Sequence, residues 1–120
     1  MKILLADNHT LFREGFSRQL QRFESATDLR EVTDMNAVTA LARANEQFDL
    51  MFIDRDILGE QWRDNFKSLK SAFSGARVVM LGESEEQRDI LDAFGLGATG
   101  YITKLSSDSL IINALRLIMD

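Results

Sequence analysis

The sequence predicts an α/β protein in which a parallel β-sheet is covered by helices on both faces. Short apolar runs alternate with longer segments in which apolar residues recur at helical spacing. The alternation repeats five times within 120 residues, a length typical of one domain. Two of the runs are apolar almost throughout, as expected for strands buried on both faces. We therefore expect a doubly wound sheet of five βα units, forming one domain over residues 1–120.

The first two units are expected within the first 47 residues. Residues 2–6 are an apolar run, and residues 10–22 form a helix whose large apolar side chains, Leu11 among them, recur every three to four positions. Residues 28–32 are half polar, which is typical of a strand at the edge of a sheet. Residues 35–47 carry alanine, valine and leucine on one helical face, so a second helix is expected there.

The third and fourth units contain the two apolar strands, at residues 49–53 and 77–81. Between them, residues 64–73 place phenylalanine and leucine at helical spacing, and the Ser-Gly pair that follows ends this helix. Residues 85–94 form the fourth helix. Because both strands lack an alternating polar face, we expect them in the middle of the sheet.

The fifth unit consists of a strand at residues 101–103 and a helix at residues 107–119. Ser107 has the side chain of a helix N-cap, and the apolar stripe that follows includes Leu110 and Ile111. Right-handed crossovers, with the half-polar second strand at an edge, predict the flavodoxin-like strand order 2-1-3-4-5. Ligands of such sheets bind beyond the carboxyl ends of the strands.

Composition excludes several classes of function. Cysteine is absent and His9 is the only histidine, so we expect neither a thiolate zinc site nor a histidine metal cluster, and a metal would need oxygen ligands. The formal charge of −5 disfavours nucleic-acid binding by this segment. No apolar run is long enough to span a membrane and the first residues are not a signal peptide, so we expect a cytoplasmic protein without membrane contact.

Polar residues and a glycine lie at the expected carboxyl ends of four strands: Asp7 with Asn8, Asp54, Gly82 and Lys104. With their spacing, they resemble the receiver domains of two-component response regulators, and the resemblance extends over the whole chain. Residues 1–15, MKILLADNHTLFREG, are similar to the branch that carries a LuxR-type helix-turn-helix, and residues 97–104, GATGYITK, match the receiver pattern around its lysine.

The resemblance implies roles for three of these residues. Asp54 is the phosphoacceptor, which takes a phosphoryl group from a sensor histidine kinase. Lys104 pairs with the phosphoryl oxygens, and Tyr101 is the aromatic residue whose position changes with phosphorylation. Such a domain is not an enzyme. It controls an output domain, here expected to bind DNA and to lie outside the 120 residues.

The resemblance also implies a Mg²⁺ site made by Asp7, Asn8, Asp54 and Asp56. Asn8 stands where the family has the acid that binds the ion directly, and an amide oxygen is a weaker ligand than a carboxylate. We therefore expect weak Mg²⁺ binding. Asp56 either restores part of the lost charge or is a solvated loop residue.

Further departures from the family pattern surround the acceptor. Gly82 replaces the serine or threonine that contacts the phosphoryl group, and Glu83 adds a negative charge that either repels a phosphodonor or pairs with Lys104. The usual Met-Pro-Gly loop reads Ile-Leu-Gly at residues 57–59, which predicts a loop of different shape. Trp62 replaces a glycine and either packs within the loop, covers the altered pocket as a lid or anchors a partner.

Three functions are compatible with these residues. The first is a receiver that is phosphorylated at Asp54. The second is a degenerate receiver that acts without phosphate as a dimerisation or interaction module, which Asn8 and Gly82 favour. The third and most remote is an aspartate-nucleophile phosphatase, because residues 54–56 also match the Asp-x-Asp motif of haloacid dehalogenases, although Gly82 and the chain length argue against it.

A homodimer is expected in the first two cases. We predict a two-fold interface through the helices at residues 10–22 and 107–119, or through the surface made by residues 85–94, 101–103 and 107–119.

Overall fold

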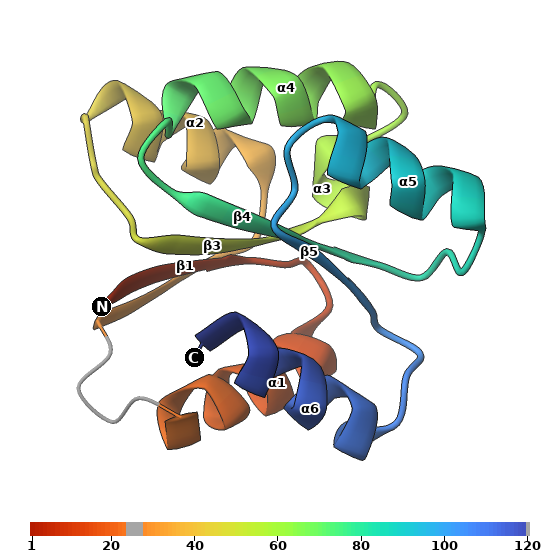
Figure 1. Cartoon of the computed structure of the whole chain (residues 1–120). Coiled ribbons are helices and arrows are strands. Elements are labelled where there is room, and N and C mark those ends of the chain that lie inside the picture. The colour runs from red at the N-terminus through yellow and green to blue at the C-terminus, as the bar shows by residue number, and fades with distance from the viewer. Residues whose placement is uncertain (24–27, 120) are drawn as a thin grey trace.

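The computed structural model describes residues 1–23 and 28–119, and within them five parallel strands form one sheet in the order β2-β1-β3-β4-β5 (Figure 1). The fold class and the strand order predicted from the sequence are thus confirmed, with the half-polar strand β2 at an edge. The strands are β1 (Lys2–Ala6), β2 (Asp28–Val32), β3 (Leu50–Asp54), β4 (Arg77–Gly82) and β5 (Gly100–Thr103).

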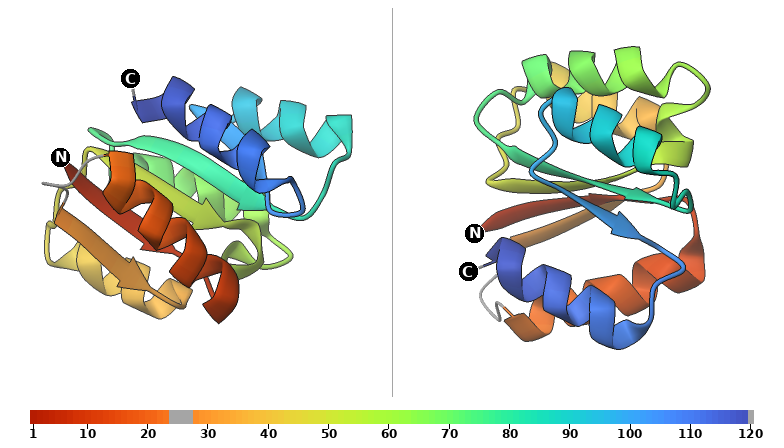
Figure 2. Two further views of the ribbon diagram at one scale, coloured as in Figure 1. Left: turned by 90° about the horizontal axis from the view of Figure 1, so that it is seen from below. Right: turned by 45° about the vertical axis from the view of Figure 1, so that its right-hand side comes forward.

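The helices divide between the two faces of the sheet. α1 and α6 cover one face, whereas α2, α4 and α5 cover the other, with the one-turn helix α3 at the end of β3 (Figures 1 and 2). Their bounds are α1 (Thr10–Phe23), α2 (Met35–Arg43), α3 (Arg55–Leu58), α4 (Trp62–Ala72), α5 (Gln87–Gly95) and α6 (Asp108–Met119).

The core lies in two layers on either side of the sheet, because successive side chains of a strand point to opposite faces. In β3, Met51 and Ile53 pack under α2, α4 and α5, whereas Leu50 and Phe52 pack against α1 and α6. All five residues of β3 are buried. This explains why the strand is apolar throughout until it ends at Asp54.

Several helix bounds differ from the prediction, for local reasons. α2 ends at Arg43 and not at residue 47, because Asn45 adopts a left-handed conformation with φ of 58°. The turn α3 was not predicted. It forms because Asp54 Oδ1 accepts a hydrogen bond of 3.1 Å from the Asp56 backbone N–H, and it ends at Gly59, whose φ is 80°.

Two more helices begin elsewhere than expected. α4 begins at Trp62, two residues early, and α5 begins at Gln87, two residues late. In the second case the Glu86 backbone N–H donates to Ser84 Oγ at 3.1 Å, which holds residues 84–86 in a turn. Ser107 caps α6 as predicted, since its Oγ accepts a hydrogen bond from the Leu110 backbone N–H at 3.4 Å.

Two leucines that the sequence places in buried stripes are exposed. Leu11 in α1 and Leu110 in α6 are 87% and 60% exposed, because the core positions are taken by Phe16 and Leu20 in α1 and by Ile111 and Leu115 in α6. Leu105 and Leu117 are exposed as well. α1 and α6 lie side by side on one face of the sheet (Figure 2), and Leu11, Leu110 and Leu117 belong to these two helices. Among the helices described, none has the length and apolar character that a membrane span requires.

Candidate functional site

The ends of β1, β3 and β5 bring two acids and a lysine together. Asp7 and Asp54 are almost fully buried, at 0% and 1% exposure. Lys104 Nζ lies 2.7 Å from Asp7 Oδ2 and 3.2 Å from Asp54 Oδ2, and the lysine side chain is only 4% exposed. Because an unpaired charge is costly to bury, the ammonium group serves as the counter-charge of both carboxylates.

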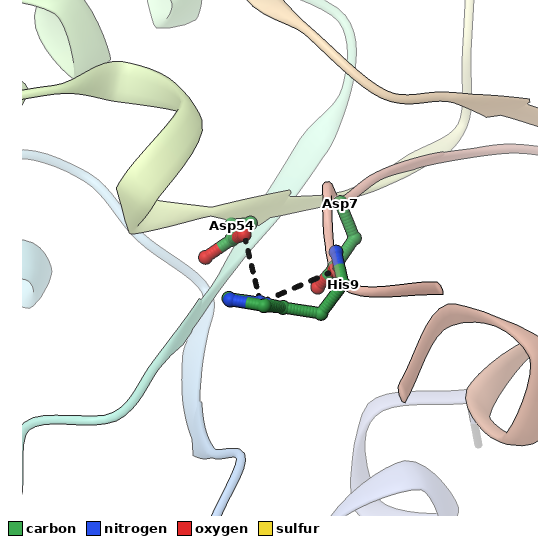
Figure 3. A group of neighbouring side chains, drawn as sticks. All are labelled: Asp7, His9 and Asp54. Atoms are coloured by element: carbon green, nitrogen blue, oxygen red, sulfur yellow. Dashed lines mark hydrogen bonds and ion pairs between the residues drawn. The ribbon is translucent and has the colours of Figure 1, made fainter. Parts of the chain in front are cut away.

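His9 completes this arrangement. Its Nδ1 lies 3.7 Å from Asp7 Oδ1 and 3.6 Å from Asp54 Oδ2 (Figure 3), and Lys104 Nζ lies 2.6 Å from the same nitrogen. The ring is placed by the turn after β1, where the His9 backbone N–H donates to Asp7 Oδ1 at 2.7 Å. His9 was considered above only for a histidine cluster, and its position beside the two carboxylates was not predicted. Its place two residues after Asp7 was the available signal.

The pocket has the properties of a cation site. Asp7 Oδ2 and Asp54 Oδ2 are buried and accept no hydrogen bond, although Lys104 is within ion-pair distance of both. Ligand atoms of Asp7, His9 and Asp54 all lie within 4.8 Å of one another. Carboxylate oxygens that are buried without a hydrogen bond are suited to a divalent cation. The residues present therefore fit such an ion.

The other expected metal ligands lie further out. Asn8 is exposed, and so is Asp56, whose side chain lies 3.7 Å from His9 Nε2 at the rim of the pocket. Glu83 is exposed and forms an outer group with His9 and Asp56. The suggested pairing of Glu83 with Lys104 is wrong, because the carboxylates within ion-pair distance of Lys104 are those of Asp7 and Asp54.

Tyr101 occupies the space beside Gly82. A Cβ at position 82 would overlap the Tyr101 hydroxyl and lie 3.0 Å from its Cζ. The hydroxyl donates to the Ser84 carbonyl oxygen at 3.0 Å. Burial raises the pKa of the Tyr101 phenol, partly opposed by the positive charge of Arg55. The position of this ring thus depends on the absence of a side chain at residue 82.

A second group of charges lies next to Asp54, around Trp62. Arg55 Nη1 donates to Asp89 Oδ2 at 2.9 Å, and Arg63 Nη2 donates to Asp89 Oδ1 at 3.2 Å. Both guanidinium groups lie over the Trp62 ring, 4.8 and 4.4 Å from its centroid. Trp62 is only 2% exposed, so it packs within the fold and is not an exposed anchor. We call Arg55, Trp62, Arg63 and Asp89 the arginine–tryptophan cluster.

The charge state of Asp89 follows from this cluster. Burial by itself raises the pKa of the carboxyl group, but hydrogen bonds from Ser84 and Arg55 and the charges of Arg55 and Arg63 outweigh it. The pKa of Asp89 is therefore below its ordinary value. The carboxylate is held charged, and it connects α5 to the residue that follows Asp54.

A parallel sheet with a buried Asp-Asp-Lys pocket at its carboxyl edge is the arrangement of a signalling receiver, and a family model confirms this class. The chain belongs to the response regulator receiver domain family, whose model matches residues 3–116. It is a receiver domain of a two-component response regulator and not an enzyme of the usual kind, which removes the phosphatase alternative. Receiver domains bind a divalent cation at an acidic pocket, and Asp7 and Asp54 form such a pocket here.

Individual relatives agree with this assignment. A glycerol metabolism activator from Pseudomonas putida is 27% identical over 119 residues, which are 99% of this chain and 54% of that protein. The chain thus spans about half the length of the curated relatives it matches.

Solved structures share the fold. A LuxR family DNA-binding response regulator from Silicibacter pomeroyi superposes with a TM-score of 0.81 at 24% identity, over 99% of this chain and 91% of that chain. A response regulator from Burkholderia pseudomallei, solved with a phosphorylated aspartic acid, a calcium ion and citrate, has a TM-score of 0.75 at 22% identity, over 95% of this chain and 65% of that chain.

Proposed function

We propose that Asp54 is the phosphoacceptor of this receiver domain and that Lys104 pairs with the phosphoryl group once it is attached. The observation that carries the proposal is the state of Asp54 Oδ2, which is buried, accepts no hydrogen bond and lies 3.2 Å from Lys104 Nζ. In the transfer, a carboxylate oxygen forms the new bond to phosphorus while the bond from phosphorus to a kinase histidine nitrogen breaks. The lysine offsets the added negative charge.

The proposed cation is Mg²⁺, bound weakly by Asp7 and Asp54. The ion would supply positive charge that neutralises the phosphoryl oxygens. Asn8 contributes no carboxylate, and Asp56 contributes its side chain only at the rim, which supports weak binding.

Residues 1–120 form one receiver domain in this proposal, and its partner is a sensor histidine kinase in the cytoplasm. The similarity to a LuxR family DNA-binding response regulator supports a DNA-binding output domain.

A homodimer is supported by the exposed leucines on α1 and α6 and in the loop between β5 and α6. These are Leu11, Leu105, Leu110 and Leu117. Loss of dimer on Leu11→Ser with Leu117→Ser, measured by sedimentation, is the expected result, and an unchanged dimer counts against this face.

The phosphoacceptor is tested by incubation with acetyl phosphate and Mg²⁺, followed by intact-mass measurement. The wild type should gain one phosphoryl group, and Asp54→Asn should gain none. Asp49→Asn is the matched control, because Asp49 lies at the opposite end of β3 and should leave labelling unchanged. Labelling that persists in Asp54→Asn would assign the acceptor to another residue.

A second candidate function is a receiver that works without phosphate. The observation that favours it is the Tyr101 ring, which already fills the space beside Gly82. A phosphoryl group on Asp54 then has no hydroxyl on β4 to attract. A ligand that binds two conformations equally does not shift the equilibrium between them. Amide chemical shifts around Tyr101 should therefore change little when beryllofluoride binds. Large shifts that reach α6 would favour the phosphorylation-dependent receiver.

A further inference from the structure

We propose that His9 is a direct ligand of the cation bound between Asp7 and Asp54, so that the pocket selects a divalent transition-metal ion over Mg²⁺. The inference rests on the proposed function, since it concerns the same acidic pocket. It adds a ligand that is neither an acid nor an amide, and with it a different class of ion.

The geometry places an imidazole nitrogen where a third ligand would lie. His9 Nδ1 faces both carboxylates, at 3.7 Å from Asp7 Oδ1 and 3.6 Å from Asp54 Oδ2 (Figure 3). These ligand atoms are already gathered within 4.8 Å of one another. An ion between them displaces the Lys104 ammonium group, after which small movements of the ligand side chains bring them to ordinary metal–ligand distances of about 2.0–2.2 Å.

The position of Lys104 is independent support for a cation at this point. Its ammonium nitrogen lies 2.6 Å from His9 Nδ1, 2.7 Å from Asp7 Oδ2 and 3.2 Å from Asp54 Oδ2. The same three side chains that would bind the ion therefore surround a positive charge of the protein itself. The lysine is a flexible, single-point charge, and it can move toward an arriving phosphoryl group when a metal ion takes its place.

The chemistry of the ligands determines the selectivity. Mg²⁺ prefers oxygen ligands in an octahedral arrangement, whereas imidazole nitrogen suits Zn²⁺, Ni²⁺ and Cu²⁺. The neutral Asn8 in place of an acid weakens the site for Mg²⁺, and it does not weaken the bond of a transition metal to His9. The imidazole of His9 and the amide of Asn8 therefore both favour a transition-metal ion over Mg²⁺.

The inner pocket is a better site than the outer group of His9, Asp56 and Glu83. All three outer side chains are at least partly open to solvent, so water already satisfies them. The inner carboxylates instead contain the buried oxygens that accept no hydrogen bond, Asp7 Oδ2 and Asp54 Oδ2. An ion bound there contacts buried oxygens whose cationic partner is otherwise Lys104.

The experiment uses a property of the composition, because His9 is the only histidine and cysteine is absent. Any shift of an imidazole nitrogen signal on addition of metal therefore comes from His9. We would titrate the unphosphorylated chain with Zn²⁺ and, separately, with Mg²⁺, by calorimetry and by nitrogen-15 NMR of the imidazole. The variants are His9→Asn, Glu83→Gln and, as a control, Glu60→Gln, an exposed acid outside both groups.

We expect saturating Zn²⁺ to shift the His9 Nδ1 signal strongly and His9→Asn to weaken Zn²⁺ binding by about tenfold or more, while Mg²⁺ affinity changes by less than about twofold. Glu60→Gln and Glu83→Gln should change neither affinity by more than about twofold. An unshifted imidazole, or equal losses for both ions, would overturn the proposal. If Glu83→Gln weakens Zn²⁺ as much as His9→Asn does, the ion lies in the outer group, and the inner site is wrong.

The result is separable from the proposed function, because no phosphodonor is present in these titrations. If acetyl phosphate still labels Asp54 while Zn²⁺ leaves His9 unaffected, only the selectivity fails. If Zn²⁺ binds through His9 but Asp54 accepts no phosphoryl group, the pocket is a metal site and the phosphoacceptor proposal fails.

Discussion

The acidic pocket and the arginine–tryptophan cluster lie next to each other, yet their carboxylates differ in hydrogen bonding. In the cluster, both oxygens of Asp89 accept hydrogen bonds from arginine or serine. In the pocket, Asp7 Oδ2 and Asp54 Oδ2 accept none, although both residues are more deeply buried than Asp89. Satisfied charges rigidify a fold, whereas oxygens without a hydrogen bond remain free to bind an incoming group. The cluster therefore has its hydrogen bonds satisfied within the fold, whereas the pocket keeps oxygens that an incoming group can contact.

The two regions are joined through consecutive residues of the chain. Asp54 belongs to the pocket, and Arg55, which follows it, belongs to the cluster. Arg55 holds α5 through Asp89, and Asp89 in turn accepts a hydrogen bond of 3.0 Å from Ser84 Oγ. The carbonyl oxygen of Ser84 accepts the Tyr101 hydroxyl. The cluster thus links the residue after Asp54 to Ser84 and, through the Ser84 carbonyl oxygen, to the Tyr101 hydroxyl.

The largest effect on stability is expected when the arginine–tryptophan cluster loses the Trp62 ring. Trp62→Ala should lower the free energy of unfolding by about 3–5 kcal/mol, because it leaves a cavity and removes the surface on which two guanidinium groups lie. Urea unfolding followed by circular dichroism measures the loss. Lys67→Ala, at an exposed position of the same helix, is the control and should cost less than about 0.5 kcal/mol. Equal midpoints for the two variants would contradict the structural role of the cluster.

Removal of the Lys104 ammonium group from the pocket should have the next largest effect. Lys104→Met leaves two buried carboxylates without their counter-charge and should cost about 3 kcal/mol of stability. A saturating divalent ion should restore part of this loss, because it replaces the missing positive charge. The measurement is urea unfolding with and without the ion. If the variant is as stable as the wild type, Lys104 does not stabilise the carboxylates.

Asp89→Asn should destabilise the fold by about 1–3 kcal/mol, since it weakens hydrogen bonds to two arginines. The effect should depend on pH. The pKa of Asp89 is lowered in the folded chain, so its stabilisation is present above the pKa of an unfolded aspartate, about 3.9, and is lost as the pH falls through the lower folded value. Urea midpoints of wild type and variant should therefore converge in strong acid. A constant difference down to that pH would mean that the charge of Asp89 is unimportant.

The smallest effect concerns Gly82. A Cβ at this position overlaps the Tyr101 hydroxyl, so Gly82→Ala should move the ring, break its hydrogen bond to Ser84 and cost about 1 kcal/mol. Gly15→Ala is the matched control: it meets no atom within 4 Å and lies inside α1, where alanine should stabilise by about 0.5–1 kcal/mol.

The same variant should change the titration of the phenol. Because burial raises the pKa of Tyr101, moving the ring toward solvent should lower that pKa toward its ordinary value of about 10. The raised pKa stabilises the wild type below the unfolded pKa, and this contribution is lost as the pH rises through the folded value. Tyr101 is the only tyrosine, so an absorbance titration reports it alone. An unchanged titration in Gly82→Ala would show that the ring did not move.

The fold and part of the site could be read from the sequence. Periodicity identified all five strands, because a strand buried on both faces, such as β3, must be apolar throughout. Their order followed from right-handed crossovers with the half-polar β2 at an edge. The position of Asp7, Asp54 and Lys104 at strand ends followed from the rule that parallel strands end at one edge. Local spacing was sufficient for these residues, since their place depends on the backbone of the sheet and not on any neighbouring side chain.

Other features depended on contacts between residues far apart in the sequence. The position of His9 over two carboxylates requires Asp54 beside it, and the burial of Trp62 requires Arg55, Arg63 and the acids of α5. The exposure of Leu11 and Leu110 was decided by how α1 and α6 face the sheet. Periodicity defines an apolar face, but the tertiary packing of that face determines which of its side chains reach the core.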